Sequence, residues 1–593
     1  MNHFQPVRPD SQNTSLAVET DPAQPVAFDG LAGFFHAAQG NTAVLLLSPW
    51  GYEELCARKT YRLLGEKLAA AGFPCLRFDY PGTGHSLGTG AGLEDDGAWR
   101  ASVRRALAEL EDLSHARRVI VMGQGIGATL AGDLAEEREL AGLVLLAPVA
   151  QGRAWLREVA AWTAMTQPTF FVAPSDGPEG SLMAGGFVLS APTVGEIKSL
   201  NLMKGPAPRT EKLLLVERPD HPGDAKLAEH LEGEGLACDR LVFEGYADYV
   251  SDPTLSIPPL GTVDAVVDWV AATFPMSADV SPAAPTVVPP AILKGPDFQE
   301  TLMRFGPGNM FFAALASPSK TVTKTAVLFL NAGYDHSIGW ARMTVDFSRA
   351  LARDGIAAFR MDLAGMGESP YWPGQARQVL YATKQNDDVK AAVDWLIGEG
   401  GFENVIVYGR CSGAYLAFVT AALDPRISGV FAVNPRRLVW DPDEDVDSAI
   451  REPIQTLSTY RSKALDPRNL GRVLSGEISL RKAASKVLSA IRRAGGRKLA
   501  PVLRGLSKHH RLNRVVHDRL QTLSARSAPV MLVYSVGDRG LSELENWVGP
   551  DLGGLKSYPN VGFSRIEGAD HNLTPVAARE EVLELLRQFI RKF

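Results

Sequence analysis

The strongest constraint on the fold is a short glycine-bounded turn that occurs twice in the chain. The first copy reads Gly-Gln-Gly-Ile-Gly over residues 123–127, and the second reads Gly-Arg-Cys-Ser-Gly over residues 409–413. Each copy follows a strand-like apolar run and precedes a helix-like one. So sharp a strand-to-helix turn presents its central side chain at the carboxyl edge of a parallel sheet. That residue is Gly125 in the first copy and Cys411 in the second. The two turns therefore predict the same backbone with different chemistry.

The turn belongs to a longer internal repeat. Asp79 is followed by Tyr-Pro-Gly-Thr-Gly, and Asp362 is followed by Leu-Ala-Gly-Met-Gly. The two aspartates lie 283 positions apart and the two turns 286 positions apart, which indicates a duplication. Both halves alternate β-rich runs with helical patterns, which is typical of βαβ units. We therefore predict an α/β protein with two tandem domains, each a mostly parallel, doubly wound sheet with a helical cap insertion.

The length of 593 residues is too great for one ordinary core. A stretch rich in Pro and Ala, residues 275–292, has no amphipathic period and is predicted to be a linker. The predicted organisation is an N-terminal tail (1–22), a first domain (23–274), the linker and a second domain (293–593). Each domain has a cap, at about 151–208 and about 436–528. The second cap is basic, with 16 Lys or Arg against three acids between Arg451 and Val515.

Composition narrows the class of protein. Hydrophobic residues make up 45% of the chain and charged residues 22%, which favours well-buried cores. The net charge of −6 indicates no nucleic-acid partner. Four scattered cysteines show neither metal-ligand nor disulfide spacing, so we expect no metal, no cofactor and a reducing compartment. The polar start of the chain and the lack of a long apolar run predict a cytoplasmic protein without a transmembrane segment. A homodimer is left open.

The second half carries a candidate catalytic set in the order nucleophile, acid, base. Cys411 is the candidate nucleophile, Asp538 follows a strand-like run, and His571 follows a later one. In this hypothesis His571 removes the thiol proton, and Asp538 orients the imidazole. Small residues must stand two positions before and after an elbow nucleophile. Gly409 and Gly413 meet this requirement for Cys411, whereas Ser412 would have an arginine on one side, so Cys411 is favoured over Ser412.

Further residues are expected around this nucleophile. The oxyanion hole should use the backbone N–H of Ser412 and a second N–H from Tyr334 or Gly333, in the loop after the first strand of the domain. His336 and Arg410 are candidates for contact with substrate or cap, and loop bracing is the competing role for His336. Asp570, beside His571, is predicted to brace its loop.

The first half lacks this set. Gly125 has no side chain, and Tyr249 stands where the repeat places His571. His85 lies on a loop, where a polar non-catalytic role is favoured. We predict a pseudoenzyme domain that supports, docks or binds.

Both halves resemble the α/β-hydrolase superfamily. The residues that carry this are Gly51–Cys56 with Phe78–Gly84 in the first half, and Leu330–Gly333 with Asp362–Ser369 in the second. More narrowly, they look like the serine-aminopeptidase-like hydrolases of bacterial exopolysaccharide (exosortase-associated) and acyl-assembly clusters. The cysteine elbow is similar to that of dienelactone hydrolases, bile-acid-conjugating acyltransferases and some thioesterases. This resemblance implies acyl transfer through a thioester.

The leading hypothesis is therefore an acyl hydrolase or acyltransferase with a Cys-His-Asp triad, acting in a biosynthetic pathway. Its substrate would be an acyl thioester or ester, and the basic cap would dock an acidic acyl carrier protein, coenzyme A or a lipid headgroup. A solvated cap without a ligand is the competing interpretation. The alternative function is a non-catalytic scaffold or carrier-docking module built from two inactive domains. A peptidase is disfavoured, because beyond His571 nothing evident assists an amide leaving group.

Overall fold

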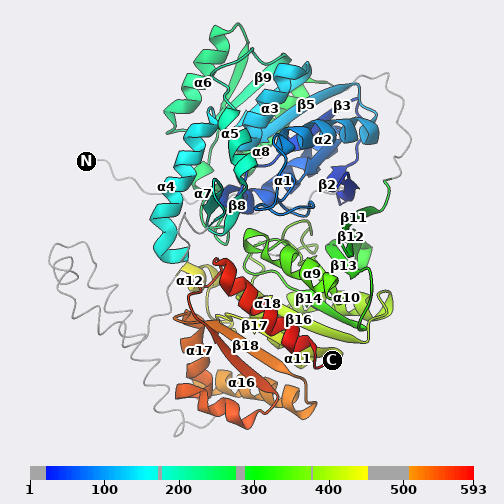
Figure 1. Cartoon of the computed structure of the whole chain (residues 1–593), viewed down its shortest axis with the longest axis vertical. Coiled ribbons are helices and arrows are strands. Elements are labelled where there is room, and N and C mark those ends of the chain that lie inside the picture. Colours follow the sequence, from blue (N-terminus) through cyan, green and yellow to red (C-terminus); the bar gives the residue numbers. More distant parts are fainter. Residues whose placement is uncertain (1–21, 171–176, 276–287, 376–377, 452–506) are drawn as a thin grey trace, which may run out of the picture.

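The computed structural model describes residues 22–170, 177–275, 288–375, 378–451 and 507–593. These residues form two α/β units, one from each half of the sequence, stacked along the long axis of the molecule (Figure 1). The N-terminal tail except for its last residue, most of the predicted linker and most of the basic cap lie outside the described residues.

The first sheet has eight strands. Their order across the sheet is β1 (Gln24–Phe28), β2 (Leu31–His36), β4 (Cys75–Phe78), β3 (Thr42–Leu47), β5 (Arg118–Gln124), β6 (Leu140–Leu146), β9 (Thr210–Glu217) and β10 (Cys238–Val242). The first two strand pairings, β1 with β2 and β2 with β4, are antiparallel. The remaining pairings are parallel, as the alternation of strands and helices predicts.

The second sheet repeats this order with one more antiparallel strand at its start. Its strands are β11 (Ala291–Gly295), β12 (Phe298–Phe305), β13 (Phe311–Pro318), β15 (Ala357–Asp362), β14 (Thr325–Phe329), β16 (Asn404–Arg410), β17 (Ile427–Val433), β18 (Val530–Ser535) and β19 (Val561–Ile566). β11 starts at Ala291, two residues before the predicted domain boundary, because Ala291 pairs with Leu302 of β12.

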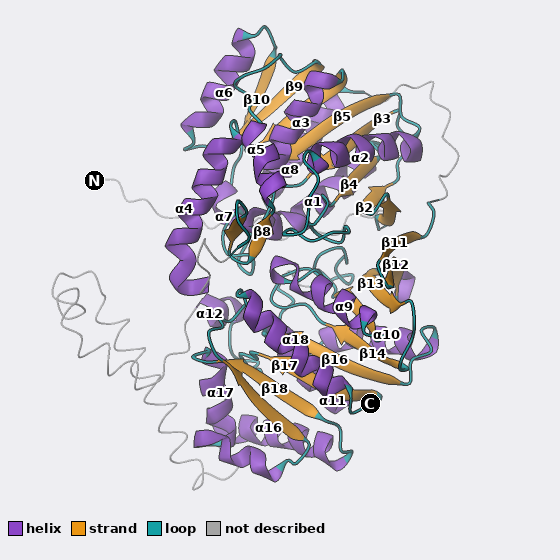
Figure 2. Ribbon diagram, viewed as in Figure 1, coloured by secondary structure: helices purple, strands orange, loops and turns teal. Residues whose placement is uncertain are grey.

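Helices cover both faces of the first sheet (Figure 2). Along β3, Val44 and Leu46 pack with α1 (Tyr52–Ala70) and α8 (Leu260–Thr273). Leu45 and Leu47 pack on the opposite face with α2 (Ala98–Ser114), α3 (Ile126–Glu137) and α6 (Pro222–Gly233). Successive strand residues point to opposite faces, so a continuous apolar run is what a sheet covered on both sides requires.

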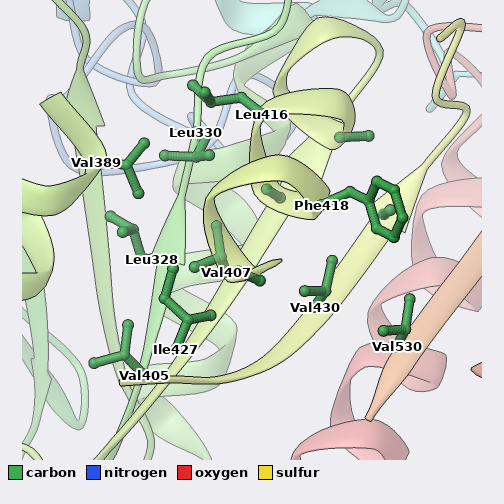
Figure 3. Packing of buried hydrophobic residues seen from close by; sticks show 14 of the residues in the cluster. Leu328, Leu330, Val389, Val405, Val407, Leu416, Phe418, Ile427, Val430 and Val530 are labelled. Carbon is green, nitrogen blue, oxygen red and sulfur yellow. The ribbon is translucent and has the colours of Figure 1, made fainter. Parts of the chain in front are cut away.

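The second domain is built in the same way. One face packs against α9 (Met343–Arg353) and α18 (Val576–Ile590), and the other against α10 (Gln385–Gly398), α11 (Ser412–Leu423) and α16 (Lys508–Ala525). Figure 3 shows the second of these cores, where Val405 and Val407 of β16 meet Leu416 and Phe418 of α11. This packing anchors the strand and the helix on either side of the second turn.

Each domain inserts a segment after the strand that follows its elbow helix. In the first domain the insertion comprises α4 (Gly152–Phe170), β7 (Leu182–Ala184), β8 (Phe187–Leu189) and α5 (Ala191–Ser199). In the second domain α12 (Val446–Arg451) and α16 flank residues 452–506, which are not described. Arg492, Arg493, Arg497 and Lys498 of the predicted basic cap fall in that range.

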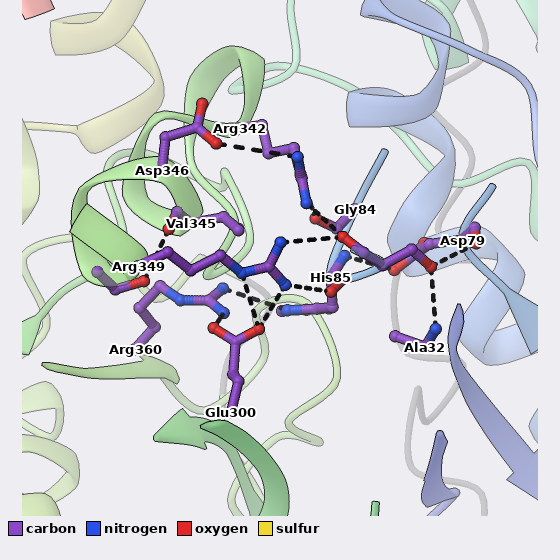
Figure 4. A network of polar contacts seen from close by, with 12 residues as sticks. Ala32, Asp79, Gly84, His85, Glu300, Arg342, Val345, Asp346, Arg349 and Arg360 are labelled. Atoms are coloured by element: carbon purple, nitrogen blue, oxygen red, sulfur yellow. Dashed lines mark hydrogen bonds and ion pairs between the residues drawn. The ribbon is translucent and has the colours of Figure 1, made fainter. Parts of the chain in front are cut away.

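The two domains share a buried interface. Phe34 of the first domain and Phe312 of the second pack edge to face, with ring centroids 5.1 Å apart, inside an apolar cluster drawn from both halves. Beside it, Arg349 of the second domain donates to the backbone oxygens of Ser86 and His85, at 3.0 and 2.6 Å (Figure 4). His85 is 1% exposed, so its place is in this interface.

Candidate active site

Cys411 stands at the turn between β16 and α11 in a conformation that side chains rarely adopt. Its φ is 55° and its ψ −118°, and Gly125 of the first domain has nearly the same angles, 57° and −122°. For a residue with a Cβ this backbone costs about 1–3 kcal/mol, and such strain gathers at functional sites. The duplicated turn therefore has one backbone, and the second domain keeps a strained thiol there.

The neighbouring glycines are required by close packing. A Cβ on Gly409 would lie 2.1 Å from the carbonyl oxygen of Gly413, and a Cβ on Gly413 would lie 2.4 Å from that of Asn331. Neither position accepts a larger residue. These distances explain why glycine stands two positions before and two positions after Cys411.

His571 and Asp538 meet in front of this turn. The ring Nδ1 of His571 lies 2.6 Å from Asp538 Oδ2, and the other carboxylate oxygen accepts the backbone N–H of Gly540 at 2.7 Å. Asp538 thereby also caps α17 (Arg539–Val548). With Nδ1 donating to the carboxylate, Nε2 is the ring nitrogen left to exchange a proton. It is buried and has no oxygen or nitrogen partner within the described part of the chain.

The electrostatics favour a charged thiol. Burial raises the pKa of Cys411, but the opposing charge and hydrogen bonding of His571, with smaller effects from Arg436 and Arg410, lower it overall to about 7. Burial alone would lower the pKa of His571, and the charge of Cys411 and the hydrogen bond to Asp538 raise it instead. Burial opposes ionisation of Asp538 too, yet its bond to His571 lowers its pKa. The three groups can hold a thiolate beside an imidazolium.

The predicted oxyanion donors have different surroundings. Gly333 lines the cavity at Cys411, and its N–H donates to the Ser412 hydroxyl at 2.8 Å. Ser412 is the first residue of α11, where a backbone N–H has no acceptor inside the helix. Tyr334 does not line this cavity, and its hydroxyl donates to Gln378. Of the two alternatives for the second donor, Gly333 lies in the cavity lining and Tyr334 does not.

His336 lies outside the lining of the cavity at Cys411. Its side chain is 3% exposed, is absent from the cavity lining, and lies 3.6 Å from Glu54 of the first domain. The sequence could not show this, because Glu54 is brought there by domain packing.

Arg410 lines the cavity, but its guanidinium is occupied. It donates to Asp335 at 2.9 Å and to Asn572 at 2.6 Å. Arg410 therefore ties the loop of His571 to the loop after β14. Asp570 braces the same loop as predicted, since it accepts the N–H and hydroxyl of Thr574.

A cavity of about 340 Å³ opens onto Cys411, and both domains build it. The first domain contributes Tyr52 and the loop Asp252–Leu255, which sequence reasoning missed. Thr254 lies so close to the oxyanion loop that a Cβ on Gly333 would be 3.0 Å from its hydroxyl oxygen. No local sequence signal marks these residues, because only the domain interface brings them to the cavity.

Two arginines give the cavity a positive side. Arg436 and Arg539 both line it, and neither forms an ion pair with another described residue. The Nε of Arg436 is buried without a hydrogen-bond partner in the residues described. These cations favour a thiolate and an anionic group on a ligand.

The corresponding position in the first domain is filled by a carboxylate. A Cβ on Gly125 would lie 2.7 Å from Glu53 Oε2. The other oxygen of Glu53 accepts from Gln124 at 2.8 Å and from Tyr246 at 3.3 Å, and Tyr249 donates to Gln124 at 3.2 Å. This network occupies the place that Cys411 and His571 have in the second domain.

The described residues contain no cluster of three or more His, Cys, Asp or Glu placed to hold a metal ion. In the same portion of the chain, no helix is both long and apolar enough to cross a membrane.

Comparison with known families decides what the duplicated unit is. The model of the α/β-hydrolase fold matches residues 325–469, and the model of the serine aminopeptidase S33 family matches residues 42–179. Each match includes one of the two elbows. The protein is a tandem α/β-hydrolase. The fold supports a hydrolytic function for this tandem α/β-hydrolase, and the aminopeptidase model matches the half whose elbow carries Gly125.

Solved structures similar to the tandem α/β-hydrolase each match about half of it. Dienelactone hydrolase from Anabaena variabilis is 13% identical over 50% of this chain and 99% of its own, with a TM-score of 0.31. The esterase Pf2001 from Pyrococcus furiosus is 15% identical over 50% and 93%, with a TM-score of 0.32. Est1E from Butyrivibrio proteoclasticus is 14% identical over 49% and 98%, with a TM-score of 0.30. These scores are too low to bear on function. The curated proteins contained no match.

Proposed function

We propose that the second domain is an acyl hydrolase or acyltransferase that works through an acyl-Cys411 thioester. The observation that carries this is the thiol of Cys411, held in a strained elbow beside a His571 whose Nδ1 is fixed by Asp538 at 2.6 Å. The lowered pKa of Cys411, about 7, supplies thiolate at neutral pH.

In the proposed reaction, the Cys411 thiolate attacks the carbonyl carbon of an ester or thioester. Negative charge on the carbonyl oxygen would be stabilised by the N–H groups of Ser412 and Gly333, the second of which requires the Ser412 hydroxyl to move aside. As the tetrahedral species collapses, the leaving alkoxide or thiolate takes the proton from His571 Nε2. The products of this half-reaction are an acyl-Cys411 thioester and a free alcohol or thiol.

The second half-reaction regenerates the enzyme. Water, an amine or a thiol attacks the thioester carbon and gives its proton to His571, and Cys411 leaves as the thiolate. A thioester reacts more readily with amines and thiols than an oxygen ester does, so a cysteine nucleophile favours transfer as well as hydrolysis. A biosynthetic role in passing acyl groups on fits this reactivity.

The acyl donor we propose is a thioester of coenzyme A or of an acidic acyl carrier protein. Arg436 and Arg539 at the cavity support an anionic donor, as does the basic composition of residues 451–515. Reversing the charge of Arg492, Arg493, Arg497 and Lys498 should weaken carrier binding and its salt dependence. Affinity that does not change would dismiss this docking role.

The test of the catalytic proposal is intact-mass spectrometry after brief incubation with short and long acyl thioesters. Wild-type protein should gain the mass of one acyl group, and Cys411→Ala should gain none. Cys238→Ala, which removes a partly exposed thiol of the first domain, is the matched control and should acylate normally. An adduct that persists in Cys411→Ala would overturn the assignment. A protein that never acylates, and whose Cys411 alkylates no faster than free cysteine, would support the scaffold instead.

A further inference from the structure

The elbow of the first domain opens onto a cavity of its own. This cavity has a volume of about 580 Å³ and includes Gly125, Glu53 and the inserted helix α4 in its lining. A volume of this size suits a small-molecule ligand. The domain has therefore lost its nucleophile and retained the pocket in front of it.

The floor of this cavity carries a carboxylate with one oxygen still to be satisfied. Glu53 Oε1 accepts from Gln124 and Tyr246, whereas Oε2 has no hydrogen-bond partner among the described residues. Oε2 lies at the nucleophile position, 2.7 Å from where a Cβ on Gly125 would be. The absent side chain of Gly125 thus leaves room for an acceptor that faces the pocket.

No cation is paired with this carboxylate in the described residues. The guanidinium of Arg218 also lines the cavity and acts on Glu53 through its charge, but it donates to Asp224 at 2.7 Å and to the carbonyl oxygen of Pro148 at 3.0 Å. Burial raises the pKa of Glu53, and the hydrogen bond of Gln124 and the charge of Arg218 offset this only in part. A positive group arriving from the cavity would relieve that cost of burial.

The walls are aromatic. Trp50, Tyr52, Trp155, Trp162 and Tyr246 all line the cavity. Trp50 and Trp155 have ring centroids 5.8 Å apart, and those of Tyr52 and Trp162 are 5.2 Å apart, so four of the rings pack as two pairs. The electron-rich faces of Trp and Tyr attract cations, most strongly where water is excluded.

We propose that the cavity of the first domain binds an organic ammonium ion with an apolar body, whose charge lies between Glu53 Oε2 and the aromatic wall. Exposed Glu158 and Lys226 also line this cavity. They have opposite charges, and both are exposed, so the half-buried Glu53 sets the preference for a cation. Tyr52 lines both this cavity and the one at Cys411, so the ammonium site borders the acyl site.

The experiment compares two soluble probes of nearly equal shape on the full chain. Choline carries a quaternary ammonium, and 3,3-dimethylbutan-1-ol replaces that nitrogen with carbon. Calorimetry and tryptophan fluorescence should show choline binding about tenfold or more tightly than the alcohol. Equal affinity for the two probes, or no binding of choline, would overturn the proposal.

Variants locate the site. Glu53→Gln keeps the shape and the bond to Tyr246, and should weaken choline about tenfold with little effect on the alcohol. Trp155→Leu should weaken both probes. Glu139→Gln, at an exposed carboxylate outside this cavity, is the matched control and should leave both affinities unchanged. If Glu53→Gln did not fold, the two-probe comparison on wild-type protein would still decide the question.

The ammonium site and the acyl chemistry at Cys411 can be tested independently of each other. Cys411→Ala should bind choline as wild type does, and Glu53→Gln should still form an acyl-enzyme. Choline binding that disappears in Cys411→Ala but survives Glu53→Gln would place the probe in the other cavity and overturn the proposal.

Discussion

Arg77 of the first domain and Glu368 of the second form a two-point ion pair in the buried interface. The two hydrogen bonds measure 3.0 and 2.7 Å, and the side chains are 2% and 1% exposed. Both carboxylate oxygens are used and both charges are shielded from water. Breaking such a pair leaves one buried charge without compensation. The contact between the domains therefore depends on this pair as well as on apolar packing.

Arg77→Met should destabilise the protein by about 3 kcal/mol, because Glu368 would lose both hydrogen bonds of its closest partner and keep the more distant Arg58, at 3.9 Å, as its ion-pair partner. The measurement is the free energy of unfolding from denaturant titration followed by fluorescence. Arg104→Met removes one partner of the half-exposed pair with Glu137 and should cost far less. Equal losses of unfolding free energy in the two variants would show that the buried Arg77–Glu368 pair contributes no more to stability than the half-exposed Arg104–Glu137 pair.

The carboxylate of Glu368 should also make the stability of the protein sensitive to acid. Burial would raise the pKa of Glu368, but the charge and hydrogen bonds of Arg77, with Arg58 and Arg304, lower it to about 2. The unfolded value is about 4.3, so its contribution to stability is complete above that pH and is lost as the pH falls through about 2. Denaturant titrations between about pH 5 and 2.5 should show this decline, and Glu368→Gln should have a shallower one. Identical slopes would contradict the assignment.

Cys411 should be the one cysteine that alkylates rapidly at neutral pH. Its pKa is lowered to about 7, whereas burial raises the pKa of Cys238 to about 11 and those of Cys56 and Cys75 to about 12. Peptide mapping after limiting iodoacetamide at pH 7 should find the label on Cys411, with a rate that rises through about pH 7.

Asp538→Asn should slow that alkylation at pH 7. The aspartate stabilises the imidazolium of His571, and the imidazolium in turn stabilises the thiolate. Replacing Asp570, whose side chain braces Thr574, should leave the neutral-pH rate closer to wild type. A greater effect at Asp570 would reverse the roles assigned to the two acids.

Thr254 offers a test of the contribution of the first domain to the acyl site. Thr254→Phe should fill part of the cavity at Cys411 and slow acylation by long acyl thioesters about tenfold, with less effect on acetyl thioesters. Val242→Phe, at a 58% exposed position of β10, is the control outside the cavity. Rapid-quench mass spectrometry gives both rates. An equal effect on short and long donors would argue against a steric wall.

Restoring a hydroxyl at the first elbow should not restore activity. Gly125→Ser must adopt a φ near 57° and displace the Glu53 carboxylate, which we expect to cost about 1–3 kcal/mol. The variant is best made in a Cys411→Ala background and exposed to a fluorophosphonate probe. Labelling of the introduced serine would show that Tyr249 and Glu53 do not block the chemistry as described.

The duplication and the fold were predictable because they rest on local patterns. Gly409, Gly413 and the apolar runs around them determine a strand, a tight turn and a helix by steric size and hydrophobic period alone. The sequence also allowed the candidate set Cys411, Asp538 and His571 to be predicted. Each residue follows a strand, and parallel strands end at one edge of the sheet.

The roles of His336, Glu53 and Thr254 were decided by tertiary structure. His336 faces Glu54, Glu53 fills the space beside Gly125, and Thr254 reaches the oxyanion loop of the other domain. Each contact joins residues far apart in the chain, and no repeating pattern in the sequence indicates it. The physical reason is that short-range sterics and hydrophobic spacing specify the turn at Cys411, whereas the walls of its cavity exist only once the two buried faces have packed together.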